Sequence, residues 1–166
     1  MNIVIVGFMG TGKTSVAVKL SEKLNMQYMS TDDLIEQREN RSISDIFAKD
    51  GEAYFRNVEH QVVKDISQKD NLIIDTGGGV VINPENIKNL RKNSKLVCLT
   101  ATPDVIYSRT KSHSHRPLLN IQDPVGKIRD LLVQREKFYS LADIMIDTNN
   151  KNVEQIIKEI EKKLSL

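Results

Sequence analysis

The sequence has one cysteine, Cys98, no tryptophan and no long uninterrupted hydrophobic run. A single cysteine excludes a disulfide within the chain and is typical of proteins from a reducing compartment. A membrane-spanning helix needs roughly 18 or more consecutive apolar residues, and no segment approaches that length. The first residues also lack the pattern of a secretory signal peptide. We therefore expect a cytoplasmic protein that has no membrane partner.

Positive and negative charges are nearly balanced in the sequence. Lysine and arginine contribute 24 residues, aspartate and glutamate 22, and the formal net charge is +2 at pH 7. Proteins that bind nucleic acid through bulk electrostatics carry a larger basic excess, so we expect no nucleic-acid partner. The 166 residues contain no repeat, low-complexity segment or linker, and 39% of them are hydrophobic. We expect one domain spanning residues 1–166 that works as a monomer.

Short apolar segments alternate along the chain with amphipathic helical patterns. This alternation is typical of an α/β fold, in which helices cover a parallel sheet. The segments that we predict to be strands are Asn2–Val6, Gln27–Ser30, Leu72–Asp75, Leu96–Leu99 and Ile144–Asp147. In such sheets, ligands bind beyond the carboxyl ends of the strands, so the residues that follow each strand are the first candidates for a functional site.

The first predicted strand leads directly into Gly7–Thr14, which matches the phosphate-binding pattern G-x-x-x-x-G-K-[ST]. Glycines let the backbone fold closely around an anion, and the N–H groups of the loop point toward it. Lys13 is expected to reach the β- and γ-phosphates, and the Thr14 hydroxyl to ligate Mg²⁺. A glycine-rich turn without a ligand is the alternative, but the flanking strand and helix favour a nucleoside-triphosphate site. The predicted phosphate-binding residues are Gly10, Thr11, Gly12, Lys13, Thr14 and Ser15.

Carboxylates stand at the ends of the second and third predicted strands. Asp32 either favours the positive end of a helix capped by Ser30 or Thr31, or accepts a proton from a substrate hydroxyl. Its position alone leaves both interpretations open. Asp75 closes the third strand as the carboxylate of a Walker B element does, and that carboxylate serves the Mg²⁺ shell. The three glycines Gly77–Gly79 follow, and they favour a ligand lying against the main chain over a plain turn.

Two residues in the middle of the chain form a candidate pair for binding an anion. Arg56 and Glu59 are three positions apart in a helical pattern that opens at Gly51, so their side chains share one face. They form either an ordinary surface ion pair or a unit in which Glu59 holds the Arg56 guanidinium for a carboxylate ligand.

Further arginines occur in the last third of the sequence. Arg109 lies at the end of a predicted helix, where a cation complements the helix dipole. Residues 111–122 show little periodicity and carry Arg116, which is typical of a lid that closes over phosphates. A helix that begins at Asp123-Pro124 carries Arg129 and Arg135, and the sequence does not say which of these two faces the site.

Taken in this order, the motifs resemble those of the shikimate kinase family, small P-loop kinases of the nucleoside-monophosphate-kinase fold class. The resemblance covers nearly the whole chain, and the combination of motifs is far more specific than any one of them. The residues that carry it are Gly7–Thr14, Asp32 with Ile35-Glu36, Gly51-Glu52, Phe55-Arg56 with Glu59, Gly77–Gly79, Arg116–Leu119 and Arg135.

The resemblance implies a three-layer α/β/α fold with a five-stranded parallel sheet, a substrate-binding region at about residues 32–60, and a lid at about residues 111–122. It also implies ATP-dependent phosphorylation of the 3-hydroxyl of shikimate, with Mg²⁺. Lys13 and Arg116 would neutralise the transferring phosphoryl group, and Arg109 would lie against the adenine.

On the substrate side, the resemblance implies that Asp32 hydrogen-bonds the shikimate hydroxyls and acts as, or near, the base. Arg56 and Arg135 would clamp the shikimate carboxylate, and Gly78 and Gly79 would contact the ring through their backbone. An anionic polyol needs just such cations at one end and a carboxylate acceptor at its hydroxyls.

The chain departs from the family pattern at two places. The family usually has D-x-D after the second strand, with the first aspartate in the Mg²⁺ shell, whereas this chain has Ser30 there. We expect Asp75, together with Thr14, to supply the metal site instead. The turn 149–152 also lacks a proline that the family often has. A non-catalytic binding protein of this family, or a kinase for another polyol acid such as gluconate, remains the alternative.

Overall fold

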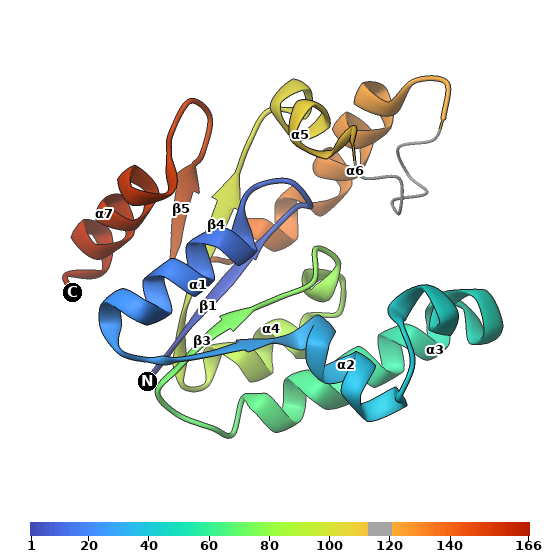
Figure 1. Cartoon of the computed structure of the whole chain (residues 1–166), viewed down its shortest axis with the longest axis horizontal. Helices are drawn as coiled ribbons and strands as arrows, with labels where there is room; N and C mark the ends of the chain where they lie inside the picture. The colour runs from blue at the N-terminus through green and yellow to red at the C-terminus, as the bar shows by residue number, and fades with distance from the viewer. Residues whose placement is uncertain (113–120) are drawn as a thin grey trace.

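The computed structural model describes residues 1–112 and 121–166, and its helices lie on both sides of one central sheet (Figure 1). The sheet is parallel, with strand order β2-β3-β1-β4-β5. All five predicted strands are confirmed, with β1 and β4 slightly longer than predicted. The strands are β1 (Asn2–Gly7), β2 (Gln27–Ser30), β3 (Leu72–Asp75), β4 (Ser94–Thr100) and β5 (Ile144–Asp147).

The helices alternate with the strands and begin where capping residues favour them. Thr102 and Asp123 each cap a helix whose first residue is proline, and the start of the second helix at Asp123-Pro124 confirms the prediction from the sequence. The Ser30 side chain accepts a hydrogen bond from the Asp33 N–H and so caps the helix that carries Asp32. The helices are α1 (Lys13–Leu24), α2 (Thr31–Glu39), α3 (Ile43–Ile66), the 3₁₀ turn η1 (Val80–Ile82), α4 (Pro84–Arg91), α5 (Pro103–Thr110), α6 (Pro124–Tyr139) and α7 (Val153–Leu164).

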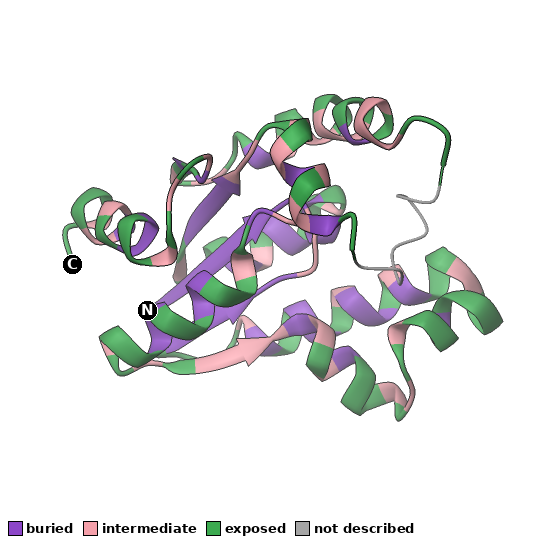
Figure 2. Ribbon diagram, turned by 45° about the horizontal axis from the view of Figure 1, so that its top comes forward, coloured by how far each residue is buried: buried purple, intermediate pink, exposed green. Residues whose placement is uncertain are grey.

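Alternating side chains of β1 enter two separate hydrophobic cores. Val4 and Val6 pack with residues of α3, α4 and α6 on one face of the sheet. Ile3 and Ile5 pack with α1 and α7 on the other face. The central strands are therefore buried on both faces, whereas the edge strand β2 is only partly buried (Figure 2). This packing explains why the buried parts of these strands are runs of consecutive apolar residues in the sequence.

Helix α3 is interrupted at Gly51, where the backbone has φ 84° and ψ 177°. A residue with a side chain rarely adopts such a positive φ, so glycine permits the kink. The prediction that a helix opens at Gly51 describes only the second half of α3, because a further helical segment begins at Ile43. The predicted substrate-binding region, residues 32–60, comprises most of α2 and α3.

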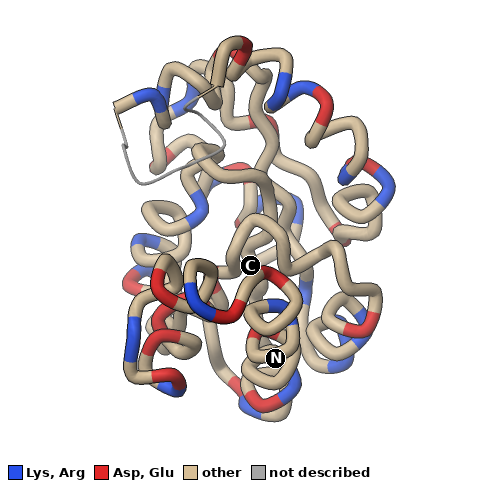
Figure 3. Tube along the Cα trace, turned by 90° about the vertical axis from the view of Figure 1, so that its right-hand side faces the viewer, with Lys and Arg blue, Asp and Glu red and all other residues tan. Residues whose placement is uncertain are grey.

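The carboxyl ends of the strands lie between two helical regions, with α2 and α3 on one side and α5 and α6 on the other (Figure 1). Lysine, arginine, aspartate and glutamate are interspersed along the outer helices (Figure 3). Within residues 1–112 and 121–166, no helix is long and apolar enough to cross a membrane. The predicted lid at about residues 111–122, with Arg116, lies almost entirely outside the described residues.

Candidate active site

The phosphate-binding loop joins β1 to α1 and has the backbone geometry that its glycines predict. Gly10 has φ 75°, and Gly12, the residue that precedes α1, has φ 91°. A Cβ on Gly10 would lie 2.6 Å from the Thr110 side chain, so a glycine is required there for contact with α5 as well as for its backbone conformation. The Lys13 Nζ donates a hydrogen bond to the Phe8 carbonyl, 3.0 Å away, at the mouth of the loop. Loop N–H groups and the amino end of α1 together form an anion site.

Thr14 and Asp75 are in direct contact although they are 61 positions apart. The Thr14 Oγ1 donates a hydrogen bond of 2.6 Å to Asp75 Oδ2, and the Tyr28 hydroxyl donates to the same oxygen over 3.2 Å. Burial raises the pKa of the Asp75 carboxyl, while the hydrogen bond from Thr14 and the charge of Lys13 act in the opposite direction. A hydroxyl has one proton and two lone pairs, so Thr14 can give its proton to Asp75 and still offer oxygen lone pairs to a cation.

Asp32 lies beside the glycine turn that follows β3. A Cβ on Gly77 would come within 2.9 Å of Asp32 Oδ1, so only glycine allows this close approach. The Gly77 N–H donates to Thr31 Oγ1 over 3.1 Å, which fixes the turn to the start of α2. Burial and then the charge of Asp75 raise the pKa of Asp32, and the ammonium of Lys13 lowers it. Asp32 is therefore within electrostatic range of both the phosphate loop and the predicted metal ligand.

Arg56 and Glu59 form an ion pair of 2.8 Å inside the protein. Glu59 is only 1% exposed, so the alternative of an ordinary surface pair is wrong. Burial raises the pKa of Glu59 even though Arg56 favours its charged form. Among the described residues, neither Glu59 Oε1 nor Arg56 Nε has a hydrogen-bond partner. A Cβ on Gly79 would lie 2.4 Å from Arg56 Nη2, so the glycine turn leaves room for the guanidinium.

Helix α6 brings Arg135, and not Arg129, to this turn. The Arg135 Nη1 donates to the Gly78 carbonyl over 3.2 Å, and its guanidinium carbon lies 5.2 Å from the centre of the Phe8 ring. Tyr139, one helical turn further on, donates its hydroxyl proton to the same carbonyl over 3.0 Å. Arg129 is exposed. Arg135 and Arg56 thus reach the glycine turn from opposite sides of the sheet edge.

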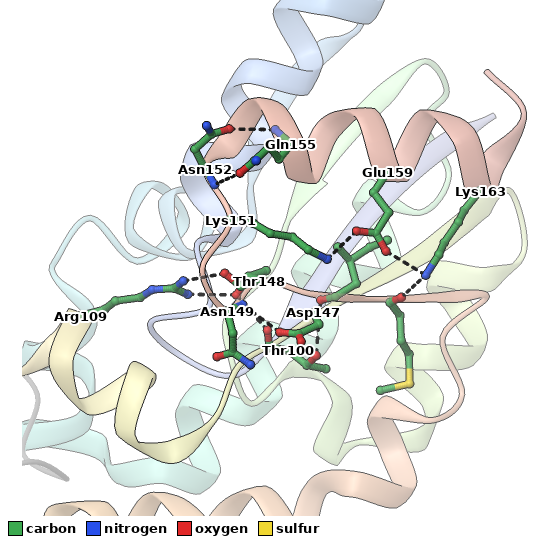
Figure 4. Close-up of polar contacts among 12 residues, drawn as sticks. Thr100, Arg109, Asp147, Thr148, Asn149, Lys151, Asn152, Gln155, Glu159 and Lys163 are labelled. Atoms are coloured by element: carbon green, nitrogen blue, oxygen red, sulfur yellow. Dashed lines mark hydrogen bonds and ion pairs between the residues drawn. The ribbon is translucent and has the colours of Figure 1, made fainter.

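Arg109 contacts both the phosphate loop and the segment that follows β5, and its contacts with Thr148 in that segment are drawn in Figure 4. Its Nη1 donates to the Gly10 carbonyl over 3.2 Å and to Thr148 Oγ1 over 3.0 Å, and its Nη2 donates to the Thr148 carbonyl over 2.8 Å. Thr148 in turn donates to the Thr100 carbonyl at the end of β4. Arg109 thus does more than complement the dipole of α5, because it fixes the relative positions of two loops.

Three contributors to the site were not predicted from the sequence: Tyr28, Tyr139 and Thr148. They belong to a strand, a helix and a strand end, and nothing in the local sequence of Tyr28 or Thr148 marks either residue as a hydrogen-bond partner. Tyr139 could have been found from its spacing, because it lies four residues after Arg135 and shares its helical face. The roles of Tyr28 and Thr148 can be recognised only once the order of the strands is known, because each residue bonds to a residue of a neighbouring strand.

Comparison with known proteins identifies the family of the chain. A sequence profile described as shikimate kinase matches residues 9–165. The shikimate kinase of Caldanaerobacter subterraneus is 45% identical over 96% of this chain and 93% of its own length. That of Thermoanaerobacter pseudethanolicus is 43% identical over 97% of this chain and 94% of its own.

Solved structures give the same result at the level of the fold. The structure of the shikimate kinase of Acinetobacter baumannii in complex with shikimate superposes with a TM-score of 0.92 and 34% identity, covering 99% of this chain and 93% of that one. A gluconokinase from Sinorhizobium meliloti has a TM-score of 0.64 at 13% identity, a likeness of fold alone. The family profile covers nearly the whole chain, and relatives 45% and 43% identical to it match over nearly their full length. The chain therefore belongs to the shikimate kinase family.

Proposed function

We propose that this protein transfers the γ-phosphoryl group of ATP to the 3-hydroxyl of shikimate, giving shikimate 3-phosphate and ADP. The observation that carries this proposal is the convergence of Arg56, Arg135 and Asp32 on the turn Gly77–Gly79, next to a phosphate-binding loop. A cation pair suits a carboxylate and a buried carboxylate suits hydroxyls, so this arrangement fits an anionic polyol substrate.

The substrate carboxylate would lie between Arg56 and Arg135. Glu59 accepts from Arg56 Nη1 at 2.8 Å, and the exposed Glu52 lies farther away, with its Oε1 3.5 Å from both Nη2 and Nε of Arg56. The substrate carboxylate would replace this longer contact with Glu52. Planar guanidinium groups bind a carboxylate with two parallel hydrogen bonds, and this geometry fixes the orientation of the ring as well as its position. The backbone of Gly78 and Gly79 would line the ring, because these residues have no side chain to exclude it.

Asp32 would accept hydrogen bonds from the substrate hydroxyls and take the proton of the reacting one. Its pKa is raised by burial, which makes the carboxylate a better base than an exposed aspartate. Lys13 would lie at the β- and γ-phosphates, where its charge offsets the negative charge of the transferring group. Arg109 would lie against the adenine, and Arg116, from outside the described residues, would add a second charge at the phosphates.

The residues at the phosphate loop fit Mg²⁺. Magnesium takes oxygen ligands, and in nucleotide kinases it is commonly held by one or two protein groups together with phosphate oxygens and water. Thr14 and Asp75 supply a hydroxyl and a carboxylate that already contact each other. When bound, the cation would neutralise the negative charge that develops during phosphoryl transfer. We propose Thr14 as a ligand and Asp75 as its charge partner, directly or through water.

The same proposal places the protein in the cytoplasm as a monomer, with ATP and shikimate as its small-molecule partners. A coupled assay of ADP release tests the activity. Shikimate is compared with gluconate and with other polyols and hydroxy acids, each at equal concentration, with ATP and Mg²⁺. Release that depends on shikimate alone is the expected result. Release with gluconate alone would identify a different kinase, and binding of shikimate without release would identify a non-catalytic protein.

A further inference from the structure

Tyr139 is the last residue of α6, and its side chain is almost completely buried. It is 5% exposed and packs within the core on one face of the sheet. Its hydroxyl nevertheless has a polar partner, because it donates to the Gly78 carbonyl over 3.0 Å. Burial raises the pKa of Tyr139 to about 12, so the hydroxyl keeps its proton and stays a donor throughout the neutral range.

The Gly78 carbonyl therefore has two donors from the same helix. Arg135 Nη1 is the second donor, at 3.2 Å. Residues four apart on a helix share one face, so Tyr139 and Arg135 approach the carbonyl side by side. The Phe8 ring lies 5.2 Å from the guanidinium carbon of Arg135. Together these contacts leave the guanidinium little freedom to turn.

Fixing the Gly78 carbonyl also fixes the next N–H group. In a planar trans peptide the C=O of one residue and the N–H of the following residue point in opposite directions. Because the Gly78 carbonyl points toward α6, the Gly79 N–H points away from α6. Arg56 lies beside the same residue, since a Cβ on Gly79 would meet its Nη2 at 2.4 Å. The Tyr139 hydroxyl, through the Gly78 carbonyl, therefore influences the orientation of both the Arg135 guanidinium and the Gly79 N–H.

We propose that Tyr139 is a positioning residue for carboxylate recognition: its hydroxyl, by sharing the Gly78 carbonyl with Arg135, sets the orientation of the Arg135 guanidinium and of the Gly79 N–H toward the substrate. This inference deepens the proposed function and rests on it. Tyr139 itself touches no substrate and takes no part in the transfer of the phosphoryl group. Its loss should therefore weaken the binding of shikimate while the chemical step and the binding of ATP are maintained.

The test is Tyr139→Phe, which removes the hydroxyl and keeps the ring in the core. We expect the shikimate KM to rise roughly 3- to 10-fold, the effect of one lost hydrogen bond, with kcat and the ATP KM within about 2-fold. Ser140→Ala is the matched control, because the Ser140 hydroxyl also donates one hydrogen bond to a backbone carbonyl, that of Lys137, but on the exposed side of the end of α6. The control should leave all three constants unchanged.

A double-mutant cycle with Arg135→Lys separates positioning from a general loss of stability. If Tyr139 acts through Arg135, the double variant should raise the shikimate KM by less than the product of the two single effects. Effects that multiply fully would overturn the proposal. So would a Tyr139→Phe variant with a lower melting temperature and an unchanged shikimate KM. Tyr139→Leu removes the same hydroxyl and serves if the Phe variant cannot be purified.

The two proposals fail in different ways. If the unaltered protein releases no ADP with shikimate, the proposed function is wrong. If the unaltered protein phosphorylates shikimate and Tyr139→Phe has the same shikimate KM, only the role of Tyr139 is wrong.

Discussion

Ser30 and Asp75 are register partners in the parallel pair of β2 and β3, and only Asp75 has a carboxylate. The Ser30 hydroxyl accepts a hydrogen bond from the Asp33 N–H and so serves as the cap of α2. Asp75 contacts Thr14. The family usually has an aspartate at the position of Ser30 on β2. In this chain the carboxylate of Asp75 lies on the adjacent strand β3, at the same edge of the sheet.

We therefore predict that Asp75→Asn weakens metal binding. Loss of a residue that supports a metal ligand typically costs about 10- to 100-fold in metal affinity. The Mg²⁺ concentration for half-maximal activity should rise by that order, and so should the Kd for Mn²⁺, measured by electron paramagnetic resonance in the presence of ADP. Adding Ser30→Asp to this variant should restore part of the affinity, because it places a carboxylate at the register partner. A lower melting temperature with unchanged metal affinity would instead make Asp75 a cap of the glycine turn.

Lys13→Ala removes the charge that we place at the β- and γ-phosphates. We expect kcat to fall by at least about 100-fold, because preorganised charge at the transferring group commonly contributes that much. The far-ultraviolet circular dichroism spectrum should not change. Lys19→Ala is the control, since Lys19 lies on the same helix and pairs with Glu22 at the surface. Normal turnover by the Lys13 variant would remove the phosphate loop from the mechanism.

The sheet could be predicted because its physical signal is local. A strand segment buried on both faces is apolar, and β1, β3 and β4 each contain such a run: Ile3–Val6, Leu72–Ile74 and Leu96–Leu99. The phosphate loop could be predicted for the same reason, since its conformation is set by glycines within one turn. The candidate carboxylates were found because in a parallel sheet the carboxyl ends of the strands meet at one edge.

The individual hydrogen bonds between distant segments could not be predicted. The sequence placed Thr14 and Asp75 at one metal site, but their direct hydrogen bond, like that between Tyr139 and Gly78, depends on strand order and helix orientation. The choice of Arg135 over Arg129 depends on the rotation of α6 about its axis. The first half of α3 was missed because only one of its side chains, Ile46, is buried in the core.

The two arginines predicted to bind the substrate carboxylate can be tested with lysine. Arg56→Lys and Arg135→Lys keep the charge and lose the planar pair of donors, so the shikimate KM should rise roughly 10-fold or more. The ATP KM should stay within about 2-fold. Arg129→Lys on the exposed side of α6 is the control and should have no effect. An equal rise of both Michaelis constants would assign the arginines to the nucleotide or to the fold.

Asp32→Asn retains the size and the hydrogen-bonding capacity of the side chain but removes its basicity. If Asp32 takes the proton of the reacting hydroxyl, kcat should fall by about 100-fold or more, while the shikimate Kd from calorimetry changes little. A variant that binds shikimate poorly but turns over normally at saturation would make Asp32 a binding group only.

The same variant should also be more stable than the unaltered protein at neutral and alkaline pH. Burial, followed by the charge of Asp75, raises the pKa of folded Asp32 above 3.8, its usual value. Above the raised pKa, the folded protein must bear an ionised carboxylate that the unfolded chain accommodates in water, so ionisation lowers the free energy of unfolding. This cost disappears as the pH falls below the ordinary value of 3.8, where the carboxyl is protonated in both states. Asparagine never ionises, so the melting temperature of Asp32→Asn should exceed that of the unaltered protein most above the raised pKa, and the difference should shrink as the pH falls toward 3.8. A difference that does not vary with pH would mean that ionisation of Asp32 carries no cost in the folded state.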